Sequence, residues 1–286
     1  GALAALHTMV RKLFRGFLAP PGATTAALLT ISYDDKAQFH RFGAYPVRVP
    51  QGKNRAALLR RVAEQYPLSD TPLVIGFLNG VLAFDVGSRE AHICLFRSGG
   101  NNVLLGSMQK LIFLFLAVLM VEEGKLMIHG AGLGMAGGGC LFLGASGAGK
   151  STVAGYAKPE EVLSDDAPVI GRNGGAFTIH ASPFSQVDLF AAKASDHHRK
   201  EAPLARIVFL RQAKRLTLEP RDRHSALAEL LREHIHGFEI MDRDLRVRAF
   251  EFCCEMCAAV PGFDLHFPRD NRFLSLFAEP PARGER

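Results

Sequence analysis

The sequence lacks an apolar stretch long enough to cross a lipid bilayer. Its longest uninterrupted apolar run covers only residues 111–121, whereas a membrane-spanning helix needs about 20 such residues. The run therefore predicts a buried helix, and we expect no transmembrane span. Residues 2–18 lack the charged start, apolar centre and small-residue cleavage site of a signal peptide. This amphipathic segment is expected to pack on the rest of the protein, with a membrane-surface helix as the alternative, and the expected location is cytoplasmic.

A disulfide framework is also missing from the sequence. The chain has five cysteines, an odd number, and Cys253, Cys254 and Cys257 fall in one expected helix. No second pair with the spacing of a zinc site accompanies this CCxxC pattern. A shared ligand face on the helix is the alternative, but we favour the interpretation that these cysteines are small apolar residues of the core.

Blocks of like charge do not occur in the sequence. Lys and Arg number 34 against 28 Asp and Glu, which gives a net charge of +6, and these residues are spread along the chain. No nucleic-acid recognition motif accompanies the basic excess. We therefore expect no nucleic-acid partner, because a mild excess of positive charge also suits a protein that binds a triphosphate.

The first hundred residues have the pattern of a β-rich region. Alternating stretches between Ala26 and Pro50 predict short strands, and residues 54–65 predict a helix. Apolar runs on both sides of Asn79-Gly80 predict a hairpin, which a strand at 91–96 follows. We expect residues 1–100 to form a β-rich N-terminal region that is a candidate for acceptor recognition.

The remainder, residues 101–286, has the pattern of an α/β domain. A long helix is expected from Val103 to Glu123, with Gly124 just past its end. Beyond it, apolar segments at 126–135 and 140–143 predict strands. This part of the chain carries the glycine-rich motif described next, so we expect it to be a nucleotide-binding domain.

A glycine-rich loop, GASGAGKS, lies between the expected strand at 140–143 and an expected helix at 151–157. Glycines adopt positive φ and leave room for phosphate oxygens to approach backbone N–H groups. In loops of this type the lysine, here Lys150, reaches the β- and γ-phosphates and the Ser151 hydroxyl binds magnesium. The expected ligand is therefore a nucleoside triphosphate, ATP, with Mg²⁺. The expected contact residues are Gly144, Ala145, Ser146, Gly147, Ala148, Gly149, Lys150, Ser151 and Thr152.

Two adjacent carboxylates, Asp165 and Asp166, follow the helix after the loop. One can hold the metal together with Ser151, and the other can accept a proton from an attacking hydroxyl. Which aspartate does which stays open, and a solvated or helix-capping pair is the alternative. His129 is expected at the end of the strand before the one that feeds the loop, where a lone histidine is more typical of a satisfied core residue.

These elements in order, IHGAGLGMAGGGCLFLGASGAGKST and then VLSDD, resemble the kinase domain of HPr kinase/phosphorylase and its related proteins. The same order occurs in ATP-dependent phosphoenolpyruvate carboxykinase. The resemblance touches most of residues 125–277 and implies a phosphoenolpyruvate carboxykinase-like P-loop kinase domain with a mixed sheet. It implies that residues 144–152 bind the triphosphate, that Asp165 or Asp166 is the general base, and that His129 lies near the transferred phosphate.

Two departures separate the chain from HPr kinase proper. Thr152 stands where that enzyme has a glutamate after the loop serine, and the later loop that recognises its protein partner has no counterpart here. The expected function is ATP- and Mg²⁺-dependent transfer of phosphate to a hydroxyl of a protein, peptide or small-molecule acceptor other than HPr. HPr kinase is a hexamer, so a homo-oligomer is one alternative for this chain, and its oligomeric state stays open.

Two alternatives to the kinase stay open. A non-catalytic accessory or sensor protein would bind the nucleotide through Lys150 without transferring phosphate. Nucleotide hydrolysis coupled to movement would need an arginine near the γ-phosphate. By position along the chain, the candidates for that arginine are Arg206, Arg211 and Arg215.

Overall fold

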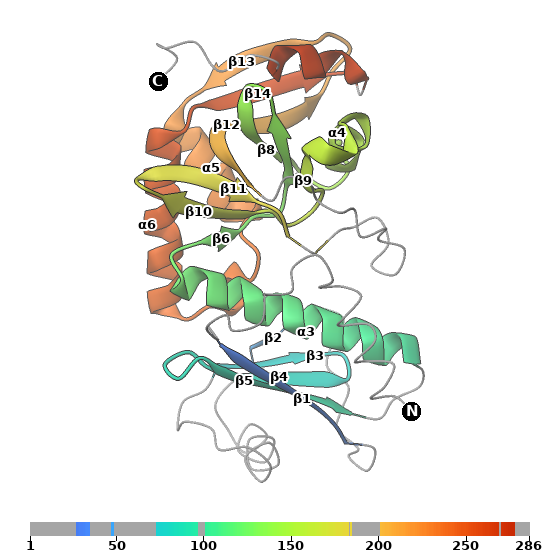
Figure 1. Ribbon diagram of the computed structural model, residues 1–286, viewed down its shortest axis with the longest axis vertical. Coiled ribbons are helices and arrows are strands. Elements are labelled where there is room, and N and C mark those ends of the chain that lie inside the picture. The colour runs from blue at the N-terminus through green and yellow to red at the C-terminus, as the bar shows by residue number, and fades with distance from the viewer. Residues whose placement is uncertain are drawn as a thin grey trace. The chain divides into compact units, whose positions relative to one another are not determined.

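The computed structural model describes residues 27–34, 47–48, 73–96, 101–182, 184, 201–268 and 270–277. These residues belong to two compact units, shown in Figure 1. The first unit contains the described residues up to Glu122 and residues 237–242, and the second contains 123–236 and the described residues from Arg243 onward. The predicted helix at 54–65 and the amphipathic segment at 2–18 lie outside the described residues.

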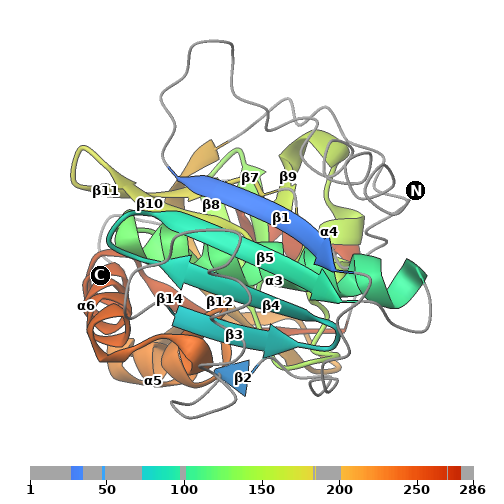
Figure 2. The same ribbon diagram turned by 90° about the horizontal axis from the view of Figure 1, so that it is seen from below.

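The first unit is a five-stranded sheet with a long helix on one face. The strand order is β1-β5-β4-β3-β2, in which β1 is parallel to β5 and the other neighbours are antiparallel. The helix α3, Asn101–Glu122, lies across this sheet (Figure 2). The strands are β1 Leu28–Asp34, β2 Val47–Arg48, β3 Leu73–Phe77, β4 Gly80–Asp85 and β5 Glu90–Phe96. The β-rich character predicted for this region is therefore confirmed.

The predicted hairpin forms, but its turn lies one residue earlier than Asn79-Gly80. Phe77 pairs with Gly80, so Leu78 and Asn79 make the turn, with a φ of 46° at Leu78. Gly80 is instead the first residue of β4, where a Cβ would lie 2.6 Å from Cδ1 of Leu111 in α3. Close packing under the helix, rather than the turn, therefore requires this glycine.

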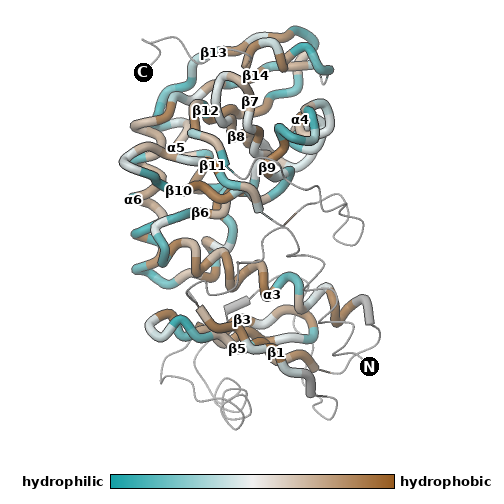
Figure 3. Tube along the Cα trace, in the orientation of Figure 1, coloured by the Kyte–Doolittle hydropathy of each residue, from teal (hydrophilic) through white to brown (hydrophobic). Residues whose placement is uncertain are grey.

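The apolar run at 111–121 lies in α3, as predicted. By length and composition, the part of this helix from Val103 to Glu122 could cross a membrane, but 67% of it is buried inside the protein. Figure 3 shows how much of α3 and of the neighbouring strands is hydrophobic. Burial of this kind is typical of the core helix of a globular unit. Gly124 follows the helix with a φ of 67°, in agreement with the predicted end.

The second unit is built on a mixed sheet. Its main path is β6-β10-β11-β12-β8-β7-β9, and β14 joins β12 to β13. β12 is parallel to β8 and β14, whereas β7–β8, β7–β9 and β10–β11 are antiparallel. The mixed α/β fold class is therefore confirmed. The strands are β6 Leu126–Met127, β7 Ala131–Met135, β8 Gly138–Leu143, β9 Val162–Ser164, β10 Val169–Asn173, β11 Ala176–His180, β12 Glu201–Gln212, β13 Thr217–Arg221 and β14 Gly262–Phe267.

Glycines in β7 and β8 allow this sheet to curl. A Cβ on Gly132 would lie 2.7 Å from Cδ1 of Ile179, and one on Gly139 would lie 2.5 Å from Cγ2 of the same side chain. Ile179 belongs to β11, which is not a neighbour of β7 in the strand order. The sheet therefore folds over onto itself, and these glycines serve packing rather than phosphate binding.

Helices of 3 to 17 residues complete the second unit. They are α4 Lys150–Tyr156, η2 Pro159–Glu161, α5 Arg223–Glu233, α6 Arg243–Ala259 and η4 Asn271–Phe277, while η3 Phe238–Ile240 falls in the first unit. Phe273 and Phe277 of η4 are fully buried and pack edge to face on Phe142 of β8. Cys253 and Cys257 are buried in α6, and all five cysteines are unpaired. The interpretation of the α6 cysteines as small core residues is therefore confirmed for these two.

Candidate functional site

The glycine-rich loop lies between β8 and α4, where the sequence predicts it. Gly147 and Gly149 have φ values of 79° and 119°, a conformation that residues with a side chain rarely adopt. The loop also turns back on itself, because the N–H of Ala148 donates to the carbonyl of Ala145 at 3.0 Å. A Cβ on Gly144 would lie only 2.7 Å from the Cβ of Ala148. The glycines are therefore needed for the shape of the loop itself.

Lys150 is buried inside this loop, with 6% of its surface exposed. Its Nζ donates to the carbonyl of Gly144 at 2.7 Å and to that of Ala145 at 3.4 Å. Burial lowers the pKa of Lys150, and the negative charges of Asp166 and Glu233 partly oppose that effect. Its partners within the loop are neutral carbonyl groups, which an anionic ligand can replace.

Gln212, at the end of β12, supports the tip of the loop. Its Nε2 donates to the carbonyl oxygen of Gly147 at 2.7 Å. Since β12 is parallel to β8 and pairs with it, the end of one strand is placed beside the loop that follows the other. No sequence motif marks this glutamine.

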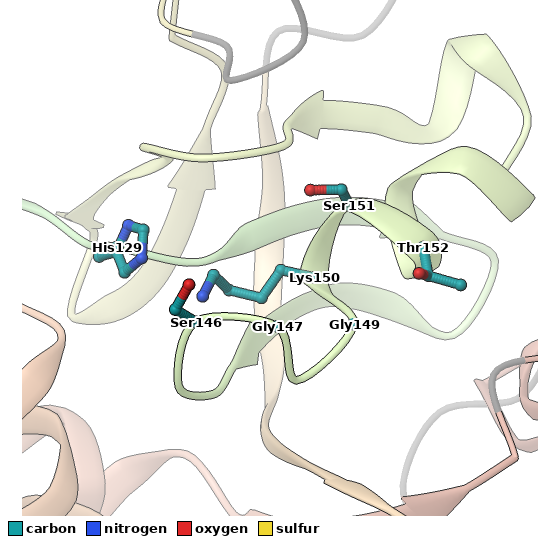
Figure 4. A pocket seen from close by; sticks show the side chains of 7 residues that line it. All are labelled: His129, Ser146, Gly147, Gly149, Lys150, Ser151 and Thr152. Atoms are coloured by element: carbon teal, nitrogen blue, oxygen red, sulfur yellow. The ribbon is translucent and has the colours of Figure 1, made fainter.

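A pocket with a volume of about 200 Å³ opens over the loop (Figure 4). The side chain of Lys150 extends from the start of α4 toward His129, and Ser146 lies near its end, whereas Thr152 points away from it. The pocket is lined by His129, Ser146, Gly147, Gly149, Lys150, Ser151 and Thr152. Six of the predicted loop residues thus line it together with His129, whereas Gly144, Ala145 and Ala148 are not among the lining residues.

Asp165 and Asp166 follow β9 in a turn that Ser164 holds in place. The buried Oγ of Ser164 accepts hydrogen bonds from the N–H groups of Ala167 at 3.0 Å and Asp166 at 3.4 Å. The same hydroxyl donates to the carbonyl of Phe184 at 3.2 Å. These contacts fix the backbone from which both carboxylates project, so the pair is neither a helix cap nor part of a simple exposed loop.

His129 lies in a bend between β6 and β7, not at the end of one continuous strand as predicted. The strand is interrupted at Gly130, where a Cβ would lie 2.8 Å from the carbonyl oxygen of Phe142. Nδ1 of His129 lies 3.1 Å from Oδ1 of Asp166, and the N–H of Gly130 donates to the main-chain carbonyl of Asp166 at 3.0 Å. The fold therefore brings His129 and Asp166 into direct contact.

His234 and His236, which no sequence motif marks, lie beside His129. The N–H of His129 donates to the carbonyl of His234 at 2.7 Å, and Nδ1 of His234 donates to the carbonyl of His129 at 3.0 Å. The rings of His129 and His236 have centroids 5.2 Å apart. The only sequence signal was the segment EHIHG after the α5 region, and nothing in it shows that this segment returns to His129.

Three side chains at this point could hold a metal ion. His129, Asp166 and His236 each offer one ligand atom, and these atoms lie within 4.8 Å of one another. Ser151, the predicted ligand of magnesium, lies on the pocket wall at the start of α4. Of the two aspartates predicted to bind metal, this cluster therefore includes Asp166.

Two of the three arginines considered for a hydrolysis mechanism contact other groups. Arg211 donates to both carboxylate oxygens of Glu229 and to Asp264. Arg206 is buried, with its guanidinium 5.5 Å from the centre of the Phe277 ring. Arg215 is exposed just beyond the end of β12. The structure therefore offers little support for any of these three arginines as the one beside the γ-phosphate.

The fold and the site together define a class: a mixed α/β protein with a strand, a glycine-rich loop and a helix, next to a histidine–aspartate cluster. The family described as SynChlorMet cassette protein ScmC matches residues 93–277, more than half of the chain. The protein therefore belongs to the ScmC family. No curated protein matches the sequence.

Proposed function

We propose that this protein is an ATP- and Mg²⁺-dependent phosphotransferase, related to HPr kinase and with a phosphoenolpyruvate carboxykinase-like P-loop domain. It would phosphorylate a hydroxyl of a protein, peptide or small molecule. The observation that carries the proposal is the pocket over the loop, which has buried Lys150 on one side and His129, in contact with Asp166, on the other. Phosphoryl transfer depends mainly on a cation that holds the phosphates and a carboxylate that orients the acceptor. The ScmC family description names a cassette and no reaction.

The loop would hold the triphosphate. Lys150 would exchange its contacts to the carbonyls of Gly144 and Ala145 for phosphate oxygens, since charged acceptors make stronger hydrogen bonds than neutral ones. The exposed hydroxyl of Ser151 lies on the pocket wall, where it would bind the Mg²⁺ that accompanies ATP. When bound, Mg²⁺ neutralises charge on the phosphates during transfer.

The aspartate pair would supply the proton acceptor. Ser164 fixes the turn that carries both aspartates, and the charge of Asp166 acts on Lys150 of the loop. One of them accepts the proton of the acceptor hydroxyl as its oxygen bonds to the γ-phosphorus. The bond from that phosphorus to the β–γ bridging oxygen breaks at the same time, and ADP leaves.

A transfer assay with γ-labelled ATP tests this proposal. Hydroxyl-bearing peptides and metabolites, and the products of neighbouring genes, serve as acceptors. Wild type and the control Lys158→Met, which changes an exposed lysine after α4, should both transfer label. Lys150→Met should bind no nucleotide and transfer none. Label transfer that persists in both Asp165→Asn and Asp166→Asn would contradict the mechanism.

One observation favours a second candidate, a non-catalytic nucleotide-binding accessory or sensor protein. The pocket volume of about 200 Å³ is below the range of about 300–1,000 Å³ that is usual for ligand pockets, so a bound triphosphate would leave little space in it for an acceptor, which a sensor does not need. A sensor would bind ATP through Lys150 and give no labelled product with any acceptor. A cytoplasmic location, a homo-oligomer, acceptor recognition by residues 1–100 and the lack of a nucleic-acid partner stay predictions.

A further inference from the structure

His234 is a buried histidine that has no part in the transfer steps proposed above. It ends α5, is 1% exposed and bonds to His129, which lines the pocket. We propose that His234 is a positioning residue: the hydrogen bond from its Nδ1 to the main chain of His129 holds the His129 ring against Asp166. Its effect on rate rests on the proposed phosphotransfer, whereas the orientation of the His129 ring can be measured without nucleotide.

Both main-chain polar groups of His129 bond to His234. The N–H of His129 donates to the carbonyl of His234 at 2.7 Å, and Nδ1 of His234 donates to the carbonyl of His129 at 3.0 Å. His129 lies in the bend between β6 and β7, so these two bonds take the place that ladder bonds have in a strand. Because the backbone is held on both sides of the His129 Cα, the direction of its Cα–Cβ bond is fixed as well.

From this fixed backbone the His129 ring reaches both the pocket and Asp166. Its Nδ1 lies 3.1 Å from Oδ1 of Asp166, and Lys150 extends toward it across the pocket (Figure 4). The next residue, Gly130, donates from its N–H to the main-chain carbonyl of Asp166 at 3.0 Å. A shift of the bend would therefore move the ring away from the carboxylate and disturb the backbone of the same aspartate.

The backbone of His234 is itself held in place. Its N–H donates to the carbonyl of Leu230 at 3.0 Å and ends α5. Two residues later, the N–H of His236 donates to the carbonyl of Met127 at 3.1 Å. The end of α5 is thus joined to the segment that carries His129. Side chains on a rigid base of this kind hold functional groups in a productive geometry.

The other ring nitrogen of His234, Nε2, makes no hydrogen bond within the described part of the chain. Nδ1 carries a proton because its partner is a carbonyl, so Nε2 of a neutral ring has only a lone pair. It faces the carboxylate of Glu229, whose Oε1 lies 3.9 Å away and accepts a hydrogen bond from Arg211. A buried polar atom without a partner is costly. An apolar side chain would fill this position at a lower cost, so what the imidazole contributes here is its Nδ1 bond.

Two substitutions separate this bond from the bulk of the ring. The amide nitrogen of Asn is attached at the same point as Nδ1 of His, so His234→Asn retains a donor to the carbonyl of His129. The amide of Gln lies near the place of Nε2, so His234→Gln fills similar space but lacks that donor. Both variants leave a polar side chain in the core. The matched control is His224→Gln, which changes a histidine with an 80% exposed side chain on α5.

Steady-state transfer from γ-labelled ATP by the full chain tests the effect on rate. His234→Gln should lower kcat by about 100-fold, because a misplacement of about 1 Å near the reacting groups costs that much. The KM for ATP should stay within about twofold of wild type, since the loop and Lys150 still hold the phosphates. His234→Asn should have a kcat at least about tenfold above that of His234→Gln. His224→Gln should behave as wild type does.

Nitrogen NMR of the His129 ring tests its orientation without nucleotide. Wild type and His234→Asn should show one fixed tautomer, with the proton on the Nδ1 that faces Asp166. His234→Gln should show an average of both tautomers, because the ring is no longer held. If His234→Gln fails to fold, the wild-type spectrum decides, since an averaged His129 ring there would overturn the proposal.

An unchanged kcat in His234→Gln would overturn the positioning role, as would equal losses of kcat in His234→Gln and His234→Asn. The same His129 spectrum in His234→Gln and wild type would overturn it as well. The kinase and the positioning role can fail separately. Wild type that transfers no label, with a His129 ring that is fixed there and averaged in His234→Gln, would refute only the kinase.

Discussion

The two units of this protein differ in how they bury polar groups. In the first unit, the buried polar residues among those described carry no charge: they are Asn79, Ser107, Gln109 and His92, which bonds to Ser32 at 2.9 Å. In the second unit, Lys150, Ser164, Glu229 and His234 are all buried, and each contacts another polar group near the loop or in the α5 region. Burial of polar groups is costly unless they are paired. The second unit therefore carries a network that a purely structural unit does not need.

The comparison also indicates which kind of change each unit tolerates. The first unit depends on close apolar packing of α3 on a sheet, so added volume should harm it most. The second depends on paired charges and on a shaped loop, so removal of one partner should harm it most. Four predictions test this difference.

The largest expected effect comes from breaking the ion pairs that Glu229 of α5 makes with Arg211 and Arg221. Glu229 is 7% exposed and accepts hydrogen bonds from Arg211 and Arg221. Glu229→Leu leaves both guanidinium groups short of a partner, so it should cost about 3–5 kcal/mol of the free energy of unfolding. Denaturant titration measures this loss, and Glu251→Leu on the exposed face of α6 is the control. Equal losses in both variants would show that the network contributes nothing specific.

The next effect is a pH dependence in the first unit. Burial lowers the pKa of His92 from 6.5 to about 4, so the unfolded chain takes up a proton below about pH 6.5 while the folded unit stays neutral. The contribution of His92 to the free energy of unfolding is therefore fully present above that pH. It falls by up to about 3 kcal/mol as the pH decreases to 4. His92→Gln should remove this part of the decrease in unfolding experiments across that range. Identical pH profiles would contradict the assignment.

A smaller effect is expected from added volume under α3. Gly80→Ala places a Cβ 2.6 Å from Cδ1 of Leu111, so we expect a loss of about 1–3 kcal/mol. Gly106→Ala is the matched control, because a Cβ there meets nothing within 4 Å. Calorimetry should show a lower melting temperature for Gly80→Ala alone. Nucleotide binding by the folded protein should be unchanged, and a change would contradict the separation of the two units.

The smallest effect is expected at the tip of the loop. Gln212→Ala removes the hydrogen bond to the Gly147 carbonyl, which is worth about 1 kcal/mol, or several-fold in ATP affinity. Stability should hardly change, because Gln212 is exposed. Calorimetric titration of ATP measures the affinity. The control is Arg215→Ala, which changes an exposed residue just beyond the end of β12. The same affinity in Gln212→Ala and wild type would show that the loop keeps its shape without this contact.

Much of the fold could be predicted because its signals are local. The extent of α3 and the strand–loop–helix unit at 138–156 follow from apolar spacing, glycines and a helix end within a few residues. The hairpin turn was misplaced at Gly80 because a glycine required for packing under α3 looks the same in sequence as a turn glycine. His129 was misplaced for a similar reason, since nothing local shows that Gly130 interrupts the strand.

By itself, the sequence determined the phosphate-type loop, its lysine and the aspartate pair, because each depends on a few residues next to one another. Only the tertiary structure decided that His129 contacts Asp166 and that His234 and His236 join them. Those contacts depend on main-chain hydrogen bonds that join Gly130 to Asp166 and His236 to Met127, and no periodic pattern records which distant segments meet. The part that His234 and His236 play in this cluster could therefore be found only once the chain was folded.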